Sequence, residues 1–312
     1  MSDYKYSIEA KNVNKVFYKK SIKVNALIDF SIKLEKGTIH GLLGPNGAGK
    51  STFINILGGL VKKNSGEVKI CGINIDKNIK LSKFKIGIVP QELNIDPFFS
   101  PAELLELQAG LYGVPKRKRR TDEILDNLQL TDQRNAYART LSGGMRRRLL
   151  IGKALVHDPE MIILDEPTAG VDIDIRRSVW NYIKKISKQG KTICLTTHYL
   201  EEAENLCDSI TIINHGKKVI EGSKADLLNI ISTKSVAFVI NKDVNIPKDL
   251  DEFNPSISNG ILKLSYDKNK TNIKEIIDIL RNNQIDFKEI NTFEGDLEDV
   301  FIKVINKNDT AI

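Results

Sequence analysis

Hydrophobic and polar positions divide the chain into two parts with different patterns. From Ile8 to about Gly222, short apolar runs alternate with helical patterns, as expected where helices connect the parallel strands of a sheet. Runs that are apolar throughout are typical of strands buried on both faces, and we expect such strands at Ile86 to Val89, Met161 to Leu164, Thr192 to Thr196 and Ser209 to Ile213. Earlier in the chain, Ile8 to Phe17 and Leu27 to Leu34 alternate more, which predicts antiparallel strands.

After Lys224 the pattern changes to that of a mixed domain. It predicts a linking helix, Asp226 to Ile231, and then, in chain order, strands at Ser235 to Ile240 and Ile261 to Tyr266, a helix at Ile273 to Asn282, a strand around Phe287 to Thr292 and a helix at Leu297 to Ile305. This order favours a small α+β domain. We therefore expect an α/β domain over residues 1–225 and an accessory α+β domain over residues 226–312.

Composition and charge are compatible with a large folded core and an anionic partner. The chain has 312 residues, of which 41% are hydrophobic, with a formal net charge of +7 and a pI near 9.0. A nucleotide, a nucleic acid or an anionic membrane surface would each suit this charge. The densest basic cluster, Lys116 to Arg120, is best interpreted as a solvated face, with lipid headgroup contact as the alternative. No aromatic residues alternate with it, so nucleic-acid binding is not expected.

The sequence also gives expectations about compartment. No stretch approaches the roughly 18 apolar residues that a membrane span requires, and the polar start, Met1 to Asn12, lacks a secretory hydrophobic region. Cys71, Cys194 and Cys207 are odd in number and lack metal-ligand spacing, which favours structural cysteines in a reducing compartment. We expect a soluble, intracellular chain.

A glycine-rich run between an apolar stretch and a helical stretch matches the phosphate-binding pattern G-x-x-x-x-G-K-[ST]. The apolar stretch is Ile39 to Leu43, the helical stretch is Phe53 to Leu60, and the run comprises Gly44, Pro45, Asn46, Gly47, Ala48, Gly49, Lys50, Ser51 and Thr52. Glycines let backbone N–H groups approach phosphates, and Lys50 adds a charge near the outer phosphates. Ser51 can place its hydroxyl on Mg²⁺. The pattern predicts a nucleotide site.

Two carboxylates follow the apolar run that begins at Met161. Asp165 and Glu166 come at the end of a predicted buried strand, the edge where parallel sheets expose functional groups. Asp165 is suited to hold Mg²⁺ directly or through water, because this hard cation prefers oxygen ligands. Glu166 is suited to accept a proton from attacking water or to orient that water.

A second candidate phosphate site precedes the basic helix predicted at Arg146 to Leu155. The segment Leu141 to Met145 contains Ser142, Gly143 and Gly144. A glycine pair at a helix start exposes backbone donors, and Ser142 can cap the helix. An ordinary helix start would use Ser142 equally well.

These motifs together resemble those of ATP-binding cassette (ABC) proteins. The phosphate loop (Walker A), the LSGG sequence and the ILDEP sequence occur in that family's order over residues 8 to 222. The resemblance implies a P-loop NTPase fold, with N-terminal antiparallel strands and a helical subdomain, and ATP and Mg²⁺ as cofactors. It also implies site roles for further residues: Gln91 as a ligand of Mg²⁺ and attacking water, Asp172 in a loop that communicates between paired domains, and His198 near the γ-phosphate. By contrast, His40, His157 and His215 are expected to be structural.

Two family positions carry variation in this chain. Phe17 falls where the family places an aromatic ring against adenine, although its neighbour Tyr18 could serve instead. Met145 stands where glutamine is typical of the family, and we expect phosphate binding to survive this difference.

The resemblance further implies partners. In the family each ATP lies between the phosphate loop of one domain and the LSGG segment of another, so a second copy is expected head to tail, and a separate permease is implied. In the family, the surface corresponding to Glu92 to Tyr112 receives a helix of the permease, and this segment includes Phe98, Phe99, Leu104, Leu105 and Leu107. A permease-binding surface and an ordinary part of the core are equally compatible with its apolar residues. The ending Gly295 to Phe301 is similar to that of drug, polysaccharide and antibiotic exporter ATPases.

The expected function is therefore an ATP-hydrolysing exporter subunit at the cytoplasmic face of the membrane. The alternative is a soluble ABC protein acting on ribosomes or DNA. A second cassette or a long coiled coil would favour that alternative, and the sequence has neither. A small-molecule kinase or a GTPase is disfavoured because neither accounts for the LSGG sequence or His198.

Overall fold

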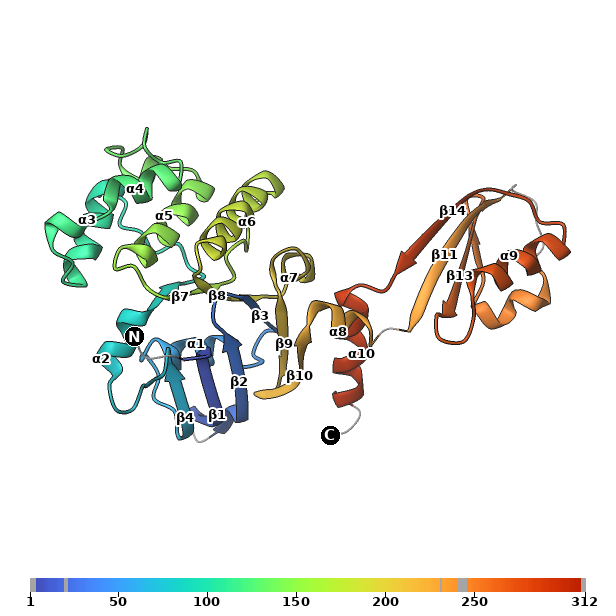
Figure 1. Cartoon of the computed structure of the whole chain (residues 1–312), viewed down its shortest axis with the longest axis horizontal. Helices are drawn as coiled ribbons and strands as arrows, with labels where there is room; N and C mark the ends of the chain where they lie inside the picture. Colours follow the sequence, from blue (N-terminus) through green and yellow to red (C-terminus); the bar gives the residue numbers. More distant parts are fainter. Residues whose placement is uncertain (1–3, 20–21, 231, 241–245, 310–312) are drawn as a thin grey trace. The chain divides into compact units, whose positions relative to one another are not determined.

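The computed structural model describes residues 4–19, 22–230, 232–240 and 246–309. The chain forms two compact units, Met1–Ser223 and Lys224–Ile312, which Figure 1 shows in the order of the sequence colours. Each unit has its own buried apolar cluster.

The first unit is built around a six-stranded sheet. Its strand order is β10-β9-β3-β8-β7-β6, and all neighbours are parallel except β10 and β9. The bounds are β3 (Ile39–Leu43), β6 (Ile86–Val89), β7 (Met161–Asp165), β8 (Thr192–Thr197), β9 (Ser209–Asn214) and β10 (Lys217–Ser223). The apolar runs predicted as buried strands are β6, β7, β8 and β9, which confirms those predictions. β10 was not predicted.

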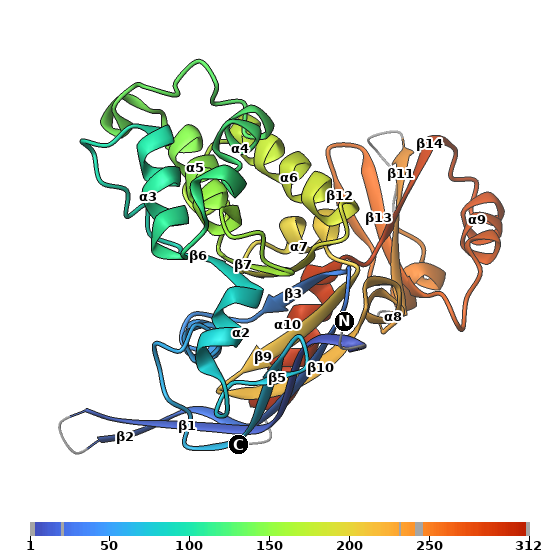
Figure 2. The same cartoon turned by 60° about the vertical axis from the view of Figure 1, so that its left-hand side comes forward.

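The N-terminal part of this unit contains a second, antiparallel sheet. β1 (Tyr6–Lys19) pairs with β2 (Ile22–Glu35) and with β4 (Ser65–Ile70), and β5 (Ile73–Asn74) pairs with β4. Figure 2 shows β1 and β2 extending together beyond the other strands. The two predicted antiparallel strands are confirmed and both are longer than expected. Phe30 of β2 packs edge-on against Phe53, with ring centroids 5.0 Å apart, in the core that the two sheets share.

Helices connect the strands of the parallel sheet. They are α1 (Lys50–Leu57), α2 (Ile79–Lys85), α3 (Pro101–Leu111), α4 (Thr121–Asn127), α5 (Gly143–Leu155), α6 (Ile173–Lys188) and α7 (Leu200–Leu206). α3, α4 and α5 contact one another and form the helical subdomain (Figure 1). A capping box between Ser100 and Glu103, followed by Pro101 at the first helical position, fixes the start of α3.

The segment from Glu92 to Tyr112 contributes to both core and surface. Leu104 and Leu105 are buried, whereas Phe98, Phe99 and Leu107 are exposed. Among the basic residues at 116–120, Arg119 pairs with Glu106 and Arg120 pairs with Glu123, and the other three side chains are exposed. This exposure agrees with a solvated face and equally with lipid headgroup contact, so both interpretations of the cluster stay open.

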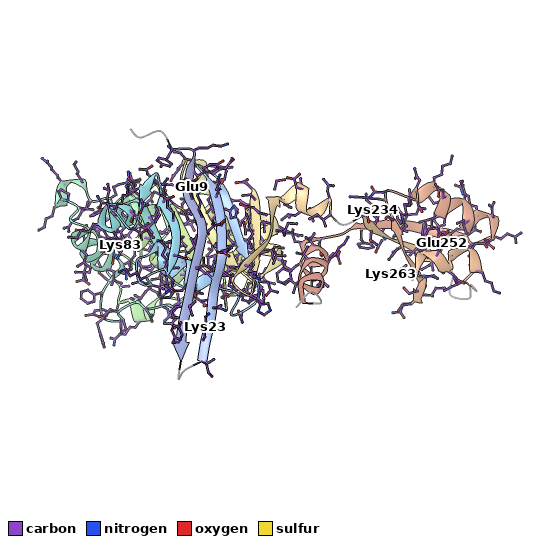
Figure 3. All side chains as sticks on the ribbon, turned by 90° about the horizontal axis from the view of Figure 1, so that it is seen from below. Glu9, Lys23, Lys83, Lys234, Glu252 and Lys263 are labelled. Carbon is purple, nitrogen blue, oxygen red and sulfur yellow. The ribbon has the colours of Figure 1, made fainter. Side chains whose placement is uncertain are left out.

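The second unit contains a four-stranded antiparallel sheet in the order β12-β13-β11-β14. Its elements are α8 (Lys224–Leu228), β11 (Thr233–Ile240), β12 (Ser256–Ser258), β13 (Ile261–Asp267), α9 (Ile273–Asn282), β14 (Phe287–Glu294) and α10 (Leu297–Asp309). The predicted strands and helices are present. The expected end of the linking helix, Ile231, lies outside the described residues. Figure 3 shows Lys234, Glu252 and Lys263 on the surface of this unit.

The core of the second unit lies between the sheet and α9. Phe238 of β11 and Leu264 of β13 are fully buried against Ile276 and Leu280 of α9. An N-terminal capping box between Asn272 and Glu275 stabilises α9.

Across the described ranges, every helix is too short or too polar to cross a bilayer. Cys71, Cys194 and Cys207 are all buried, in agreement with a structural role.

Candidate functional site

The phosphate loop connects β3 to α1 and its shape depends on glycine. Gly49 has φ +110°, and a Cβ there would lie 2.5 Å from the carbonyl oxygen of Ala26. A Cβ on Gly44 would lie 2.2 Å from the carbonyl oxygen of Ile213. Neither position can accept a side chain without backbone movement. The loop therefore has the close backbone approach and left-handed turn that a phosphate cradle requires.

Lys50 is the first residue of α1 and lies inside this loop. Its side chain is buried, and Nζ donates to the carbonyl oxygens of Gly44 at 2.7 Å and Pro45 at 3.1 Å. Burial lowers the pKa of Lys50 below its ordinary value, while Glu166 and Asp165 act in the opposite direction. The ammonium group is thus held at the centre of the loop by the loop's own carbonyl groups.

Glu166 follows β7 and is the meeting point of three segments. One carboxylate oxygen, Oε2, accepts a hydrogen bond from Gln91 Nε2 at 2.8 Å, and the other, Oε1, lies 3.1 Å from His198 Nδ1. The backbone of Glu166 has φ +47°, and its N–H donates to the carbonyl oxygen of Thr196 at 3.0 Å. This left-handed conformation is uncommon for a glutamate and turns the chain out of the strand.

Asp165 occupies the last position of β7, opposite Thr196 of β8. The Thr196 hydroxyl donates to Asp165 Oδ1. Burial raises the pKa of Asp165, and the neighbouring Glu166 charge adds to this, whereas the Thr196 hydrogen bond opposes it. A nearby cation would offset the cost of keeping this carboxylate charged.

A cavity of about 550 Å³ joins the phosphate loop to the three residues around Glu166. It is lined by Phe17, Val24, Asn25, Ala26, Asn46, Gly47, Ala48, Gly49, Lys50, Ser51, Thr52, Gln91, Glu166 and His198. Residues of β1, β2 and the phosphate loop thus meet in one hollow with residues that follow β6, β7 and β8. Among the predicted site residues, Gly44, Pro45 and Asp165 adjoin this cavity in sequence without lining it.

The cavity lining distinguishes the two aromatic candidates for base stacking. Phe17 lines the cavity, and Lys15 Nζ lies 4.6 Å from its ring centroid. Tyr18 is 76% exposed and is absent from the lining. Successive side chains of a strand point to opposite faces, so only one of the two can face the cavity.

Ser142, Gly143 and Gly144 do not line this cavity. Ser142 caps α5 and accepts a hydrogen bond from Met145 N at 3.2 Å. A Cβ on Gly144 would lie 2.5 Å from Ile175 Cγ2, so this glycine also permits α5 to pack against α6. Gly143 has no heavy atom within 4 Å of a notional Cβ. Asp172 likewise lies outside the cavity and caps α6 by accepting from Ile175 N at 2.9 Å.

Two of the other histidines have structural partners, as expected. His40 is buried with Nδ1 2.7 Å from Ser209 Oγ and Nε2 2.9 Å from Thr211 Oγ1. Burial lowers the pKa of His40 to about 4. His157 stacks on Tyr112 with ring centroids 3.7 Å apart.

The sequence reasoning missed Thr196, Arg147 and the cavity-lining segment Val24 to Ala26. Thr196 could have been found, because it ends a predicted strand beside the strand that ends in Asp165. Arg147 shares a helical face with Gly144, Ile151 and Ala154, all buried, and that spacing marks it as an inward-facing residue.

The fold and this site define a phosphate-loop ATPase. The sequence profile of the family described as "ABC transporter" matches residues 27–169. The linearmycin resistance ATP-binding protein LnrL of Bacillus subtilis is 43% identical over 222 residues, which cover 70% of each chain. The Nod factor export ATP-binding protein I of Cupriavidus pinatubonensis is 40% identical over 224 residues, covering 71% of this chain and 68% of that one.

Solved structures agree. The dimeric post-hydrolysis state of the ATP-binding cassette MJ0796, bound to ADP and Pi, matches with a TM-score of 0.63 and 29% identity, covering 69% of this chain and 98% of that one. CbiO1 from Clostridium perfringens, part of the ABC transporter complex cbiONQ, matches with a TM-score of 0.65 and 27% identity, covering 72% of this chain and 92% of that one. The chain belongs to the ABC transporter family, as an ATP-binding subunit that hydrolyses ATP.

Proposed function

We propose that this chain powers an exporter whose membrane-spanning permease is a separate protein. The names of two relatives support transport out of the cell: one is a linearmycin resistance ATP-binding protein, and the other is a Nod factor export ATP-binding protein. In this proposal the chain is peripheral and lies on the cytoplasmic face of the membrane, bound through the permease. The domain formed by residues 226–312 acts as an accessory domain, and the one formed by residues 1–225 binds the nucleotide.

The convergence of Gln91 and His198 on Glu166 beside the phosphate loop carries the hydrolytic part of the proposal. Backbone N–H groups of the loop and Lys50 bind the β- and γ-phosphates. Glu166 orients the attacking water and accepts its proton, and Gln91 and His198 fix the two oxygens of that carboxylate. His198, which lines the same cavity, is also proposed to contact the γ-phosphate.

Mg²⁺ fits the oxygen donors of this site. Ser51, Gln91 and Asp165 are the proposed ligands. In the described part of the chain, no cluster of three or more histidine, cysteine, aspartate or glutamate residues is suited to hold a metal ion. Mg²⁺ does not require such a cluster, because it is usually held by one or two carboxylates together with substrate phosphates. When bound, the ion would neutralise charge on the β- and γ-phosphates.

Two copies of the chain are proposed to meet head to tail around ATP. Ser142, Gly143 and Gly144 lie outside the cavity of their own chain, which leaves Gly143 and the start of α5 available to the γ-phosphate bound by a second copy. The dimeric cassette structure among the relatives supports this arrangement. A two-fold axis then creates two equivalent sites, and Asp172 at the start of α6 contributes to communication between them.

Co-purification tests the transport part of the proposal. We expect the tagged full-length chain, isolated in mild detergent from its source cells, to retain an integral membrane protein. The exposed side chains of Phe98, Phe99 and Leu107 are the proposed contact, and Phe98→Ser with Leu107→Ser should reduce permease recovery severalfold. Mass spectrometry of the eluate measures this. Recovery of ribosomes or DNA in place of a membrane protein would support the soluble alternative.

Phe17 is proposed to stack on the adenine ring. Phe17→Ala should raise the KM for ATP by about 5- to 150-fold, because base–aromatic stacking contributes about 1–3 kcal/mol. Tyr18→Ala is the matched control, since its ring is exposed and outside the cavity. Steady-state ATPase kinetics measure both variants, and a larger effect of Tyr18→Ala would reverse the assignment.

A further inference from the structure

Arg147 of α5 is a buried cation whose hydrogen bonds all go to backbone carbonyl groups. Its side chain is 2% exposed. Nη1 donates to the carbonyl oxygens of Pro90 at 3.0 Å and Gln91 at 2.9 Å, and Nη2 donates to the carbonyl oxygen of Glu166 at 3.4 Å. A buried charge is costly unless it is hydrogen-bonded, so a cation placed here implies that these contacts matter to the structure.

The carbonyl groups that Arg147 contacts belong to two separate segments of the site. One segment follows β6 and carries Gln91, and the other follows β7 and carries Glu166. The side chains of these two residues are themselves hydrogen-bonded at 2.8 Å. Arg147 therefore joins the backbones of two segments whose side chains must meet.

The peptide groups on both sides of Glu166 each contact another segment. Its N–H is held by Thr196 of β8, and its carbonyl group is held by Arg147. These two contacts surround the residue with φ +47°, a conformation that persists only where neighbouring groups impose it. Loss of the contact from Arg147 would leave the direction of the Glu166 side chain less constrained.

We propose that Arg147 is a positioning residue that fixes Gln91 and Glu166 for hydrolysis and attaches both to α5, the helix that begins with the LSGG segment. The inference rests on the proposed function, in which Ser142 to Gly144 contact the ATP held by the second copy. Arg147 lies one helical turn beyond Gly144. The start of α5 therefore contacts the ATP bound by the second copy, while Arg147 of the same helix positions Gln91 and Glu166 in its own chain. Each chain thereby links its own site to that of its partner.

Steady-state kinetics of Arg147→Lys and Arg147→Met test the proposal. Displacement of reacting groups by about 1 Å can cost about 100-fold, so we expect kcat to fall about 10-fold in Arg147→Lys and about 100-fold in Arg147→Met. The phosphate loop is not contacted by Arg147, and KM for ATP should stay within about twofold. Arg147→Lys keeps a charge and hydrogen-bond donors at this position. It still tests the proposal if Arg147→Met does not fold.

Arg148→Met is the matched control on the same helix. Arg148 Nη1 donates to the carbonyl oxygen of Leu128 at 2.7 Å, on the side of α4 and away from Gln91. This variant should keep kcat within about twofold. Thermal unfolding of all three variants shows whether they fold. A wild-type kcat in both Arg147 variants would overturn the proposal, as would an equal loss of kcat in Arg148→Met.

A second measurement separates positioning of Glu166 from construction of the ATP clamp. Adding Arg147→Lys to Glu166→Gln should leave the ATP-bound dimer intact by size-exclusion chromatography, because the clamp itself does not need a positioned Glu166. Loss of that dimer would show that Arg147 is needed for the LSGG segment to bind ATP, and this result would overturn the inference. If Glu166→Gln alone forms no dimer, the proposed function fails, while the kinetic comparison still tests Arg147.

Discussion

Glu166→Gln is expected to bind ATP with near-normal affinity and to lose almost all turnover. A positioned general base contributes about 10²- to 10⁴-fold, and an amide cannot accept the proton of the attacking water. Glutamine nevertheless keeps the side-chain length and one oxygen, which can still accept from Gln91 Nε2, while its NH2 group can only donate, toward His198 Nδ1. Nucleotide binding should survive because the phosphate loop and Lys50 are unchanged.

The same variant should accumulate a nucleotide-bound dimer. Closure depends on contacts to the γ-phosphate, and a chain that cannot remove this group keeps those contacts. Size-exclusion chromatography with light scattering in ATP, together with phosphate release, measures the two effects. Glu201→Gln is the control, since this exposed glutamate on α7 makes only a surface pair with Arg176 at 3.6 Å. Unchanged hydrolysis in Glu166→Gln would remove this residue from its proposed role.

The sequence predicts the parallel sheet well because its strands are buried on both faces. Runs such as Met161 to Leu164 contain only apolar side chains, and burial leaves no exposed face whose polar residues could obscure the pattern. β4 and β5 are different, since Ser65 to Ile70 alternates and β5 has only two residues. β4 depends on pairing with β1, and β5 on pairing with β4, contacts that local sequence does not reveal.

The site was predictable where one motif contains both the backbone shape and the chemistry. Gly44 to Thr52 includes the glycines, the lysine and the hydroxyl groups in a single run. Arg147 and Thr196 could not be assigned in this way, because their roles come from contacts with segments distant in sequence. The choice between Phe17 and Tyr18 required the register of β1, in which Phe17 pairs with Val24 and both line the cavity.

The LSGG segment shows why a motif alone is ambiguous. Ser142 caps α5, and Gly144 allows close packing on Ile175, so both residues have structural reasons to be present. Gly143 is different, because its notional Cβ meets no neighbouring atom. Packing among the described residues gives no reason for glycine at 143, and close approach of a second copy's phosphate would supply one.

Lys50→Ala should weaken ATP binding strongly, because it removes the single charged side chain of the phosphate loop, Gly44 to Thr52. A hydrogen bond to a charged group contributes about 1.5–3 kcal/mol, which corresponds to about 10- to 150-fold in the dissociation constant. Lys50 is the lysine within this cavity, and its Nζ already lies among the loop carbonyls of Gly44 and Pro45. Equilibrium titration with a fluorescent ATP analogue measures the change.

Lys83→Ala provides the control for net charge. Lys83 lies on α2, away from the residues that line the cavity, and Figure 3 shows its position on the first unit. Both variants remove one positive charge, so a general electrostatic effect would weaken ATP binding equally in the two, and more at low salt. A specific phosphate contact instead predicts that ATP affinity falls in Lys50→Ala alone. The thermal midpoint of that variant should then rise less than that of the wild type when ATP is added. Wild-type affinity in Lys50→Ala would contradict the phosphate role of the loop, because no other lysine and no arginine lines this cavity among the described residues.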